Sequence, residues 1–493
     1  MEQERVNGAG GRDRDLDLAS FVAGKRVTVM GLGVLGGGVG VARYLATHGA
    51  RVTVTDMRDA ASLGESIHQL HGLPITYHLG GHTLDDFTRA GADIVVRNPG
   101  VRPDSPYLVA AREDGVGVEM EMSLFFRACP APILGVTGTK GKTSVSTLCG
   151  HILRAWNPET LLAGNMGISA LAQVDRLTPA TPVVIELSSF QLEALDENRL
   201  GPHVAVITNI SEDHLDRYDD YEHYIQTKLS IGRHLSADDV VVFDRDDPQA
   251  SRVAAVTPAQ VVRFGITDDG ADGAWLAGEE IVWRMKGTEE RWPRPAQLAL
   301  QGAHGARNVL AAIAATRSYG APYAAVAQGL ASFAGVENRM EEIATIDGVL
   351  FINDTSATAP AATLAALDVL VPRARTLHLI AGGSDKRSDL HELATAIARS
   401  GARVLLLDGT ATPELRRLIE QAGGAIDGIY GSMADAVRAA VTEAHEGDIV
   451  ALSPGCASFG MFRNEFDRGG QFTAAVGEWG AGRSISAATT SGH

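Results

Sequence analysis

Residues 135–144, GVTGTKGKTS, set two lysines and three threonines among glycines, between an apolar stretch and a helical pattern. Glycines have no Cβ, so such a loop can approach phosphate oxygens closely while its amides point at the anion. Lys142 is expected to neutralise phosphate charge, and the Thr143 hydroxyl to bind Mg²⁺. The longer form of the motif needs glycine where this chain has Val136, so the match is to the shorter pattern from Gly138 to Thr143. The alternative is a glycine-rich turn with a surface lysine.

A second glycine-rich turn, GLGVLG at residues 31–36, follows the apolar stretch KRVTVM. Asp56 ends the next apolar stretch and lies twenty residues beyond Gly36. This spacing is typical of dinucleotide binding, in which the acidic side chain holds a ribose hydroxyl. Asp56 could equally cap a loop. If the loop at residues 138–143 takes ATP, the first turn could hold a nucleotide that is part of the substrate.

Acidic side chains and a histidine follow two further apolar stretches. Glu186 ends VVIE, where an unpaired carboxylate would be costly, so we expect a Mg²⁺ ligand. The alternative is a helix N-cap network with Ser188 and Ser189. The segment TNISEDHLDRY carries His214, for which we expect a catalytic or metal-binding role. Lys228 lies fourteen residues later, and spacing alone predicts a surface lysine on a helix.

Polar residues also follow the apolar stretches of the C-terminal third. NDTSATAP carries Asp354 and Thr358, AGGSDKRSD carries Lys386, and LSPGCASFGMF carries Ser453 and Ser458. Each segment alone is consistent with ordinary turn chemistry. Together they predict a polar pocket, because the carboxyl ends of parallel strands meet at one edge of a sheet.

The elements that must position these residues form three successive strand–helix–strand series. Short apolar runs rich in β-branched residues alternate with helical patterns, which indicates parallel sheets covered by helices on both faces. We predict an α/β protein of three domains, at residues 1–122, 123–335 and 336–482, with a disordered tail at 483–493. Residues 265–300 are expected to form a short β excursion.

Composition limits the class of protein. The 493 residues have a formal net charge of −17, which argues against a general nucleic-acid or anionic-membrane surface. Three widely spaced cysteines suggest neither a disulfide framework nor a cysteine metal site. The N-terminus lacks an apolar signal core, and no apolar run is long enough to span a membrane. We expect a cytoplasmic monomer without nucleic-acid or membrane partners.

Taken together, the motifs resemble those of the Mur ligases of bacterial cell-wall synthesis, from about residue 25 to 480. The segments that carry the resemblance are GVTGTKGKTS, GNMGIS, IELSSFQLE, TNISEDHLDRY, GAHGARN, FINDTSATAP, AGGSDK and LSPGCASFGMFRNEFDRG. The combination of ELSSFQLE, EDHLDRY and SPGCASF points to the D-glutamate-adding branch. The family fold implies a Rossmann-like UDP-binding domain, a central P-loop-type ATPase domain with a parallel sheet, and a C-terminal Rossmann-like domain.

The resemblance also implies a reaction and its site residues. ATP and Mg²⁺ would activate UDP-N-acetylmuramoyl-L-alanine as an acyl phosphate, which D-glutamate would then attack. The ATP-binding residues would be Gly138, Thr139, Lys140, Gly141, Lys142, Thr143, Asn308, Arg339 and Asp354. The UDP-substrate residues would be Gly33, Val34, Leu35, Gly36, Asp56, Met57, Arg58, Asn165 and Ser188. D-Glutamate would be held by Thr358, Lys386, Ser458 and Phe459.

Four residues carry the implied catalytic roles: Lys142, His214, Lys228 and Lys386. Two Mg²⁺ sites would draw their ligands from Thr143, Glu186, His214 and Lys228. In the family the lysine matching Lys228 is carbamylated, which turns a cation into an anionic oxygen ligand.

Two departures from the family pattern bear on the amino-acid pocket. Ser356 stands where some members have lysine, and FRNEF reverses an aromatic–acid order. The alternatives are another Mur ligase or a folylpolyglutamate synthase, an NAD-dependent dehydrogenase that uses residues 31–36, and a regulatory ATPase.

Overall fold

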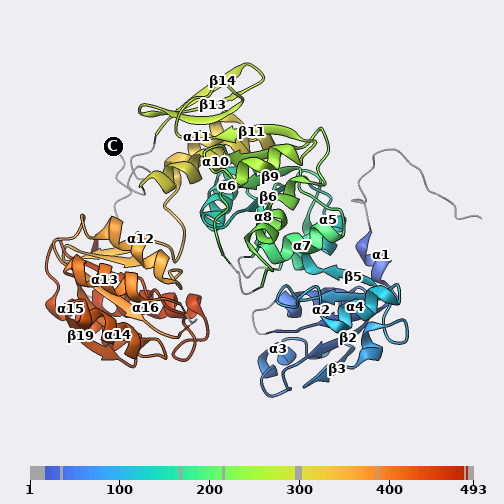
Figure 1. The fold of residues 1–493 in the computed structure, drawn as a ribbon, viewed down its shortest axis with the longest axis horizontal. Coiled ribbons are helices and arrows are strands. Elements are labelled where there is room, and N and C mark those ends of the chain that lie inside the picture. Colours follow the sequence, from blue (N-terminus) through green and yellow to red (C-terminus); the bar gives the residue numbers. More distant parts are fainter. Residues whose placement is uncertain are drawn as a thin grey trace, which may run out of the picture. The chain divides into compact units, whose positions relative to one another are not determined.

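The computed structural model describes residues 17–33, 37–165, 169–213, 217–294, 302–385, 388–481, 483 and 485–486. The chain divides into two compact units (Figure 1). Unit 1 comprises Met1–Ala299 and Ala303–Phe333, and unit 2 comprises Leu300–Gly302 and Ala334–His493.

The first sheet of unit 1 has five parallel strands in the order β3-β2-β1-β4-β5. Its strands are β1 Arg26–Met30, β2 Arg51–Asp56, β3 Ile75–Leu79, β4 Ile94–Arg97 and β5 Gly117–Met120. Its helices are α1 Leu18–Val22, α2 Gly37–Thr47, α3 Gly64–His68, η1 Leu84–Phe87, α4 Pro106–Glu113 and α5 Glu121–Ala128. Val27 and Val29 of β1 pack with α2, whereas Met30 packs with α4, because successive side chains point to opposite faces.

The second sheet of unit 1 has nine strands in the order β14-β13-β12-β11-β10-β9-β6-β8-β7. The strands are β6 Ile133–Thr137, β7 Leu161–Gly164, β8 Val183–Glu186, β9 Val204–Ile207, β10 Val240–Asp244, β11 Gln260–Phe264, β12 Gly273–Ala277, β13 Glu280–Met285 and β14 Thr288–Pro293. The helices are α6 Lys142–Trp156, η2 Leu171–Arg176, α7 Ser189–Glu197, α8 Tyr221–Leu229, η3 Ser230–Gly232, η4 Ala250–Ala255, α10 Gly302–Tyr319 and α11 Tyr323–Ser332. Strands β6 to β12 pair in parallel, and β12, β13 and β14 form an antiparallel meander.

Unit 2 holds a seven-stranded sheet in the order β19-β18-β17-β20-β16-β15-β21. Its strands are β15 Glu341–Ile346, β16 Val349–Asn353, β17 Leu377–Gly382, β18 Arg403–Leu407, β19 Ile426–Tyr430, β20 Ile449–Leu452 and β21 Ile485–Ser486. Its helices are α12 Pro360–Leu370, α13 His391–Ser400, α14 Thr412–Gln421, α15 Met433–Glu443 and α16 Glu465–Gly480. Two apolar clusters cover the sheet: α12, α13 and α14 lie on one face, and α15 and α16 on the other.

The predicted fold class is confirmed. Parallel strands alternate with helices in all three sheets, and the β excursion expected within 265–300 is the meander of β12, β13 and β14. Glu186 is the last residue of β8, and Gly31 and Gly138 follow β1 and β6 directly. The candidate residues therefore gather at the carboxyl ends of strands, where ligands bind in sheets of this kind.

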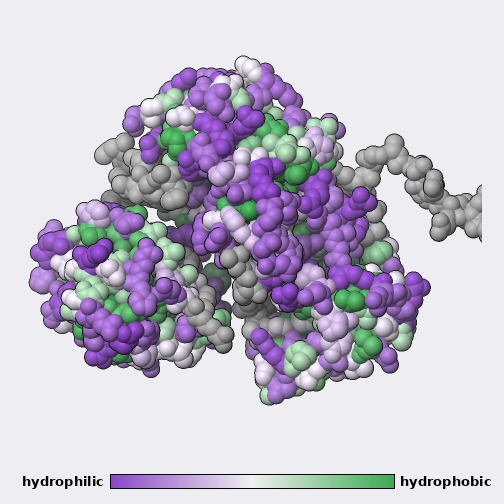
Figure 2. All heavy atoms as spheres, in the orientation of Figure 1, coloured by the Kyte–Doolittle hydropathy of each residue, from purple (hydrophilic) through white to green (hydrophobic). Residues whose placement is uncertain are grey.

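The surface is polar on the face drawn in Figure 2, where hydrophobic residues form small separate patches. No helix within the described part of the chain is long and apolar enough to cross a membrane.

Candidate active site

The loop between β6 and α6 is shaped by two glycines with left-handed backbone. Gly138 has φ 145°, and a Cβ built there would lie 1.9 Å from Thr208 Oγ1. Gly141 has φ 82°, and its Cβ would lie 2.5 Å from Asn308 Oδ1. Any other residue would strain the backbone and displace these neighbours. The same contact places Asn308, a candidate ATP residue on α10, directly against the loop.

The end of β9 holds this loop in place. The Lys140 amide donates to Asn209 Oδ1 at 2.9 Å, and the Thr208 hydroxyl donates to the Lys140 carbonyl at 2.6 Å. The Thr139 amide donates to the Asn209 carbonyl at 2.8 Å. A loop fixed in this way can bind phosphate without first being ordered, which lowers the entropic cost of binding.

Two lysines converge on one carbonyl oxygen. Lys142 Nζ donates to Gly138 O at 3.0 Å, and Lys228 Nζ donates to the same oxygen at 2.9 Å. Lys228 is only 2% exposed, so the surface position expected from its spacing is wrong. Burial and the neighbouring Lys142 charge lower the pKa of Lys228 well below its ordinary value. Lys228 is therefore disposed toward its neutral, nucleophilic form.

Glu186 provides a buried carboxylate at the same edge of the sheet. Its Oε1 accepts a hydrogen bond from Asn165 Nδ2 at 3.1 Å, and the Ser146 hydroxyl lies 3.5 Å from Oε2. The N-cap of α7 is Ser188, whose hydroxyl and amide form a capping box with Gln191, so Glu186 is not the capping group.

The chemistry of these side chains fits a hard divalent cation, which prefers carboxylate and hydroxyl oxygens. Glu186 would supply the carboxylate, and Thr143, half-buried at the start of α6, the hydroxyl. Within the described ranges, no group of three or more His, Cys, Asp or Glu side chains is clustered as a metal site. The remaining ligands of a cation there would come from substrate phosphate, from water or from a modified Lys228.

The glycine turn after β1 is held by Asp56. Gly31 has φ 90° and Gly33 has φ 64°. One carboxylate oxygen of Asp56 accepts from the Gly33 amide at 3.1 Å, and the other accepts from the Arg58 amide at 2.9 Å. Asp56 thus caps the loop, as one interpretation of the sequence proposed, while Met57 and Arg58 beside it are exposed.

In unit 2, a buried carboxylate fixes the turn that carries Arg339. Asp354 accepts from the Met340 amide at 3.1 Å and from the Ser453 hydroxyl at 2.7 Å. Asn338 and Met340 have φ 62° and 47°, so Arg339 lies between two residues with left-handed backbone. Non-glycine residues persist in such conformations only when their surroundings hold them. Burial raises the pKa of Asp354 to about 6.

A small hollow at the strand ends of unit 2 includes one of the candidate amino-acid residues. Thr358 lines this hollow together with Ser384, Asp385 and Cys456. Ser458 and Phe459 follow two residues later in the chain; Ser458 is buried, and Phe459 is 58% exposed. The segment is tied down through the Phe459 carbonyl, which accepts from the Ser384 hydroxyl.

Arg468 is a positioning residue that was not predicted from the sequence. It is fully buried, and its guanidinium donates to Thr355 Oγ1 at 3.0 Å, to Thr355 O at 2.9 Å and to Cys456 O at 3.1 Å. It therefore joins the loop that bears Thr358 to the loop that bears Ser458. The signal that could have identified it is an arginine on the buried face of a helix, α16, whereas the predicted site residues were sought after strand ends.

Five candidate residues lie outside the described residues: Val34, Leu35, Gly36, His214 and Lys386. Their roles stay predictions.

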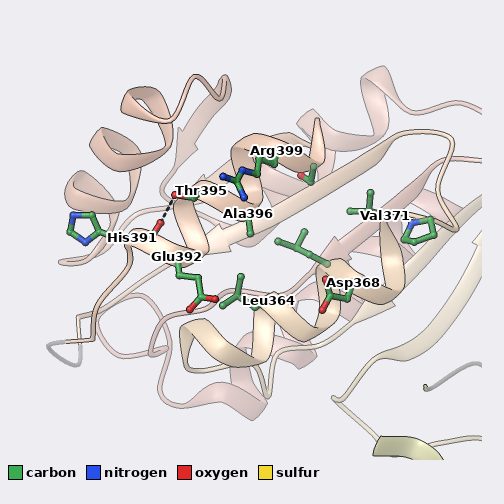
Figure 3. Close-up of a pocket in the computed structure, with 11 residues that line it drawn as sticks. Leu364, Asp368, Val371, His391, Glu392, Thr395, Ala396 and Arg399 are labelled. Atoms are coloured by element: carbon green, nitrogen blue, oxygen red, sulfur yellow. Dashed lines mark hydrogen bonds between the residues drawn. The ribbon is translucent and has the colours of Figure 1, made fainter. Parts of the chain in front are cut away.

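A separate groove of about 810 Å³ lies between α12 and α13 in unit 2 (Figure 3). Leu364 and Ala396 line it, and Asp368, Glu392 and Arg399 add charge. None of the described candidate residues lines this groove, so it is separate from the candidate chemistry.

Three family models match successive parts of the chain. The Mur ligase MurD-like N-terminal domain matches residues 25–119, the Mur ligase middle domain 136–316, and the Mur ligase glutamate ligase domain 338–456. The chain therefore belongs to the Mur ligase family.

Two relatives that are similar along nearly the whole chain have the same name. The chain is 47% identical to UDP-N-acetylmuramoylalanine–D-glutamate ligase of Roseiflexus sp., over 92% of this chain and 99% of that protein. It is 38% identical to the protein of that name from Symbiobacterium thermophilum, over 93% and 99%.

Solved structures of the family share the fold. UDP-N-acetylmuramate-alanine ligase MurC of Thermotoga maritima superposes with a TM-score of 0.58 at 20% identity, covering 92% of this chain and all of that one. MurF of Acinetobacter baumannii gives a TM-score of 0.55 at 17% identity, covering 78% and 91%.

Proposed function

We propose that this protein joins D-glutamate to UDP-N-acetylmuramoyl-L-alanine in an ATP-dependent reaction of peptidoglycan precursor synthesis. The observation that carries the proposal is the 47% identity, over 92% of the chain, to a relative named for this reaction. The phosphate loop, with two converging lysines and a buried Glu186, supports the ATP-dependent part. We expect the enzyme to act in the cytoplasm, where its nucleotide substrates occur, and to do so as a monomer.

Each predicted domain has one task in this proposal. Residues 1–122 would hold the UDP part of the substrate, with Gly33 at the pyrophosphate and Asp56, Met57 and Arg58 near uracil. Residues 123–335 would bind ATP through the loop at 138–143, with Asn308 beside it. Residues 336–482 would bring D-glutamate, and would add Arg339 and Asp354 to the ATP site.

The first chemical step activates a carboxylate, which does not react with an amine by itself. The L-alanyl carboxylate oxygen attacks the γ-phosphorus of ATP, an acyl O–P bond forms, and the bond to ADP breaks. Charge spreads over the transferring phosphoryl group, and stabilisation of that charge is the main catalytic contribution. Lys142, at the N-terminus of α6, and the amides of residues 138–141 would supply it.

Mg²⁺, when bound, supplies positive charge to the phosphate oxygens. Glu186 and Thr143 would hold one ion, and Lys228 a second, together with His214. Because an ammonium group cannot bind a cation, we propose that Lys228 is carbamylated. Its neutral Nζ adds to CO₂, an N–C bond forms and one proton leaves, which yields an anionic oxygen ligand. The lowered pKa of Lys228 favours this reaction.

The second step forms the amide. The amine of D-glutamate attacks the acyl carbon, and phosphate leaves with the electron pair of the C–O bond while the amine loses its proton. Thr358, Ser458 and Phe459, together with Lys386, would orient the amino acid. Water must be excluded, because it would hydrolyse the acyl phosphate.

Phosphate release from ATP and Mg²⁺ tests the proposal, with the two co-substrates added singly and together. We expect release only with both, and none when L-glutamate replaces the D-isomer. Activity with UDP-N-acetylmuramate and L-alanine, or with a folate and glutamate, would instead assign the chain to one of the alternatives. Release with ATP alone would contradict any ligase.

Carbamylation of Lys228 predicts a carbamate carbon detectable by ¹³C NMR after equilibration with ¹³C-bicarbonate. Lys228→Arg should lack the signal, because the guanidinium stays protonated and does not add to CO₂. Arg233→Lys is the control, because it adds a lysine amine five residues away at a half-buried position. It should leave the carbamate signal as in wild type. Equal signals in wild type and Lys228→Arg would refute the modification.

A further inference from the structure

Glu193, on α7, lies at the centre of a buried ion cluster that no step above uses. Its Oε2 accepts from Arg217 Nη2 at 2.9 Å and from Arg97 Nη2 at 3.4 Å, and its Oε1 accepts from the Tyr218 hydroxyl at 3.0 Å. The side chain of Arg97 is fully buried, and those of Glu193 and Arg217 are 12% and 11% exposed. Arg217 also stacks 4.1 Å above the Phe190 ring.

The two arginines hold the loop that follows β4 in the first sheet. Arg97 Nη1 donates to the Val101 carbonyl at 2.9 Å, and Arg217 Nη1 lies 3.4 Å from the Gly100 carbonyl. The same loop reaches the glycine turn after β1, since Asn98 Nδ2 donates to the Gly31 carbonyl at 3.3 Å. The cluster is therefore connected to the turn assigned to the UDP substrate.

The chain that bears Arg217 is also tied to the phosphate loop. Upstream of Arg217, the Ser211 amide donates to Thr139 Oγ1 at 3.0 Å, and that hydroxyl lies 3.0 Å from the Ser211 carbonyl. Ser211 is thus anchored to the ATP loop, and Arg217 to the substrate-side loop. Glu193 is the carboxylate that binds both arginines holding the substrate-side loop, Arg97 and Arg217.

Stability alone gives little reason for this arrangement. Burying charged groups costs several kcal/mol per ion, and well-packed apolar residues often do as well or better. What a buried ion cluster does supply is a defined geometry, through directional hydrogen bonds from a planar guanidinium.

We propose that Glu193 is a positioning residue, which sets the acceptor carboxylate of the UDP substrate in line with the ATP phosphate loop. The inference rests on the proposed function. It does not place Glu193 in contact with either substrate. Both sites stay intact without it, but their mutual placement is lost, and an error of about 1 Å in placement can cost about 100-fold in rate.

The test is steady-state kinetics of Glu193→Gln, measured beside the thermal unfolding of each protein. We expect kcat to fall about tenfold or more, while KM for ATP stays within about twofold, because only the relative placement changes. Glu197→Gln is the matched control. Glu197 lies on the same helix and accepts a hydrogen bond from Arg112 Nε at 2.7 Å, so it also links α7 to an element of the first sheet. Its side chain is half-exposed, and its ion pair is with Arg112 and not with Arg217. It should keep wild-type kinetics.

A double-mutant cycle then separates positioning from general damage. If Glu193 acts through Arg217, Glu193→Gln/Arg217→Gln should lose no more kcat than Glu193→Gln alone. Arg217→Lys, which keeps the charge but loses the planar fork, should also lower kcat and serves if Glu193→Gln fails to fold. Unchanged kcat in Glu193→Gln or in Arg217→Lys, additive losses, or an equal loss in Glu197→Gln would each overturn the inference. A wild type inactive on the substrate pair would overturn the proposed function as well.

Discussion

Lys142 is the residue on which the proposed phosphoryl transfer depends most directly. Its Nζ already lies over the loop, 3.0 Å from the carbonyls of Gly138 and Thr139. We expect Lys142→Ala to lower kcat by about 10² to 10³, since one group that stabilises transition-state charge contributes about that much. Binding of the UDP substrate, measured by calorimetry, should change by no more than about twofold because its site is separate.

Arg154→Ala is a suitable control for Lys142→Ala, because it removes an exposed cation from the same helix, α6. Normal kinetics are expected for it. Equal losses of kcat and of UDP-substrate affinity in Lys142→Ala would contradict separate sites for the two nucleotides.

Asp354 makes the stability of unit 2 dependent on pH. Burial raises its pKa from 3.8 to about 6, so the folded state holds this proton more tightly than the unfolded state. The contribution is complete below about pH 4 and is lost as the pH rises to about 6, a change of about 3 kcal/mol in the free energy of unfolding. Asp354→Asn should therefore show a smaller decrease in the free energy of unfolding between pH 4.5 and pH 6.5 than wild type, by about 2 kcal/mol. Parallel curves for the two proteins would show that Asp354 does not titrate there.

Individual residues also mark the limit of sequence reasoning. Spacing placed Lys228 on a helix surface, yet it is buried, because the helix α8 turns that face toward the loop at 138–139. Its contact with Gly138 joins residues ninety positions apart, which no local pattern encodes. Only the family resemblance pointed to its role.

At the scale of elements, two adjacent glycines on α16 make a matched pair. A Cβ on Gly469 would lie 2.4 Å from Asn338 Oδ1 and 2.6 Å from Thr355 Cγ2, whereas a Cβ on Gly470 meets nothing within 4 Å. Gly469→Ala should lower the stability of unit 2 by about 1 to 3 kcal/mol through overpacking. It should lower activity too, since the turn before Arg339 would move.

Gly470→Ala should instead raise stability by about 0.5 to 1 kcal/mol, the gain of replacing glycine within an exposed helix. Thermal unfolding and phosphate release on both variants provide the measurement. Destabilisation by Gly470→Ala, or a neutral Gly469→Ala, would be inconsistent with the packing of α16.

Central strands were predictable because they are continuous apolar runs, whereas strands at sheet edges were harder to recognise. The strands that were not predicted are β3, β5, β7, β11, β15, β19 and β21; five of them, β3, β5, β7, β19 and β21, end their sheets, whereas β11 and β15 lie inside theirs and are only partly buried. β3 and β19 alternate between half-buried and exposed residues, so no apolar run signals them. Helices cover edge strands less completely than central strands, so edge strands contain more polar residues.

At the scale of the whole molecule, the order of the three series along the chain was enough to predict the fold class. The sequence pattern did not indicate that two of the sheets belong to one compact unit, because the contacts between their elements join residues far apart in the chain, both in a shared apolar cluster and in pairs such as Arg112 with Glu197. The assignment of the UDP substrate to the first sheet and of ATP to the second likewise came from the family resemblance. Two glycine-rich turns alone leave open which nucleotide each one binds.

The central claim is that ATP activates the carboxylate of the UDP-linked substrate. It is tested most directly with UDP-N-acetylmuramoyl-L-alanine labelled with ¹⁸O in its carboxyl group, by mass spectrometry of the released phosphate. Transfer of one ¹⁸O atom into phosphate for each amide formed is predicted, because the attacking carboxylate oxygen leaves with the phosphoryl group. Unlabelled phosphate released alongside the product would contradict the acyl-phosphate mechanism, and the absence of product with D-glutamate would contradict the proposed function itself.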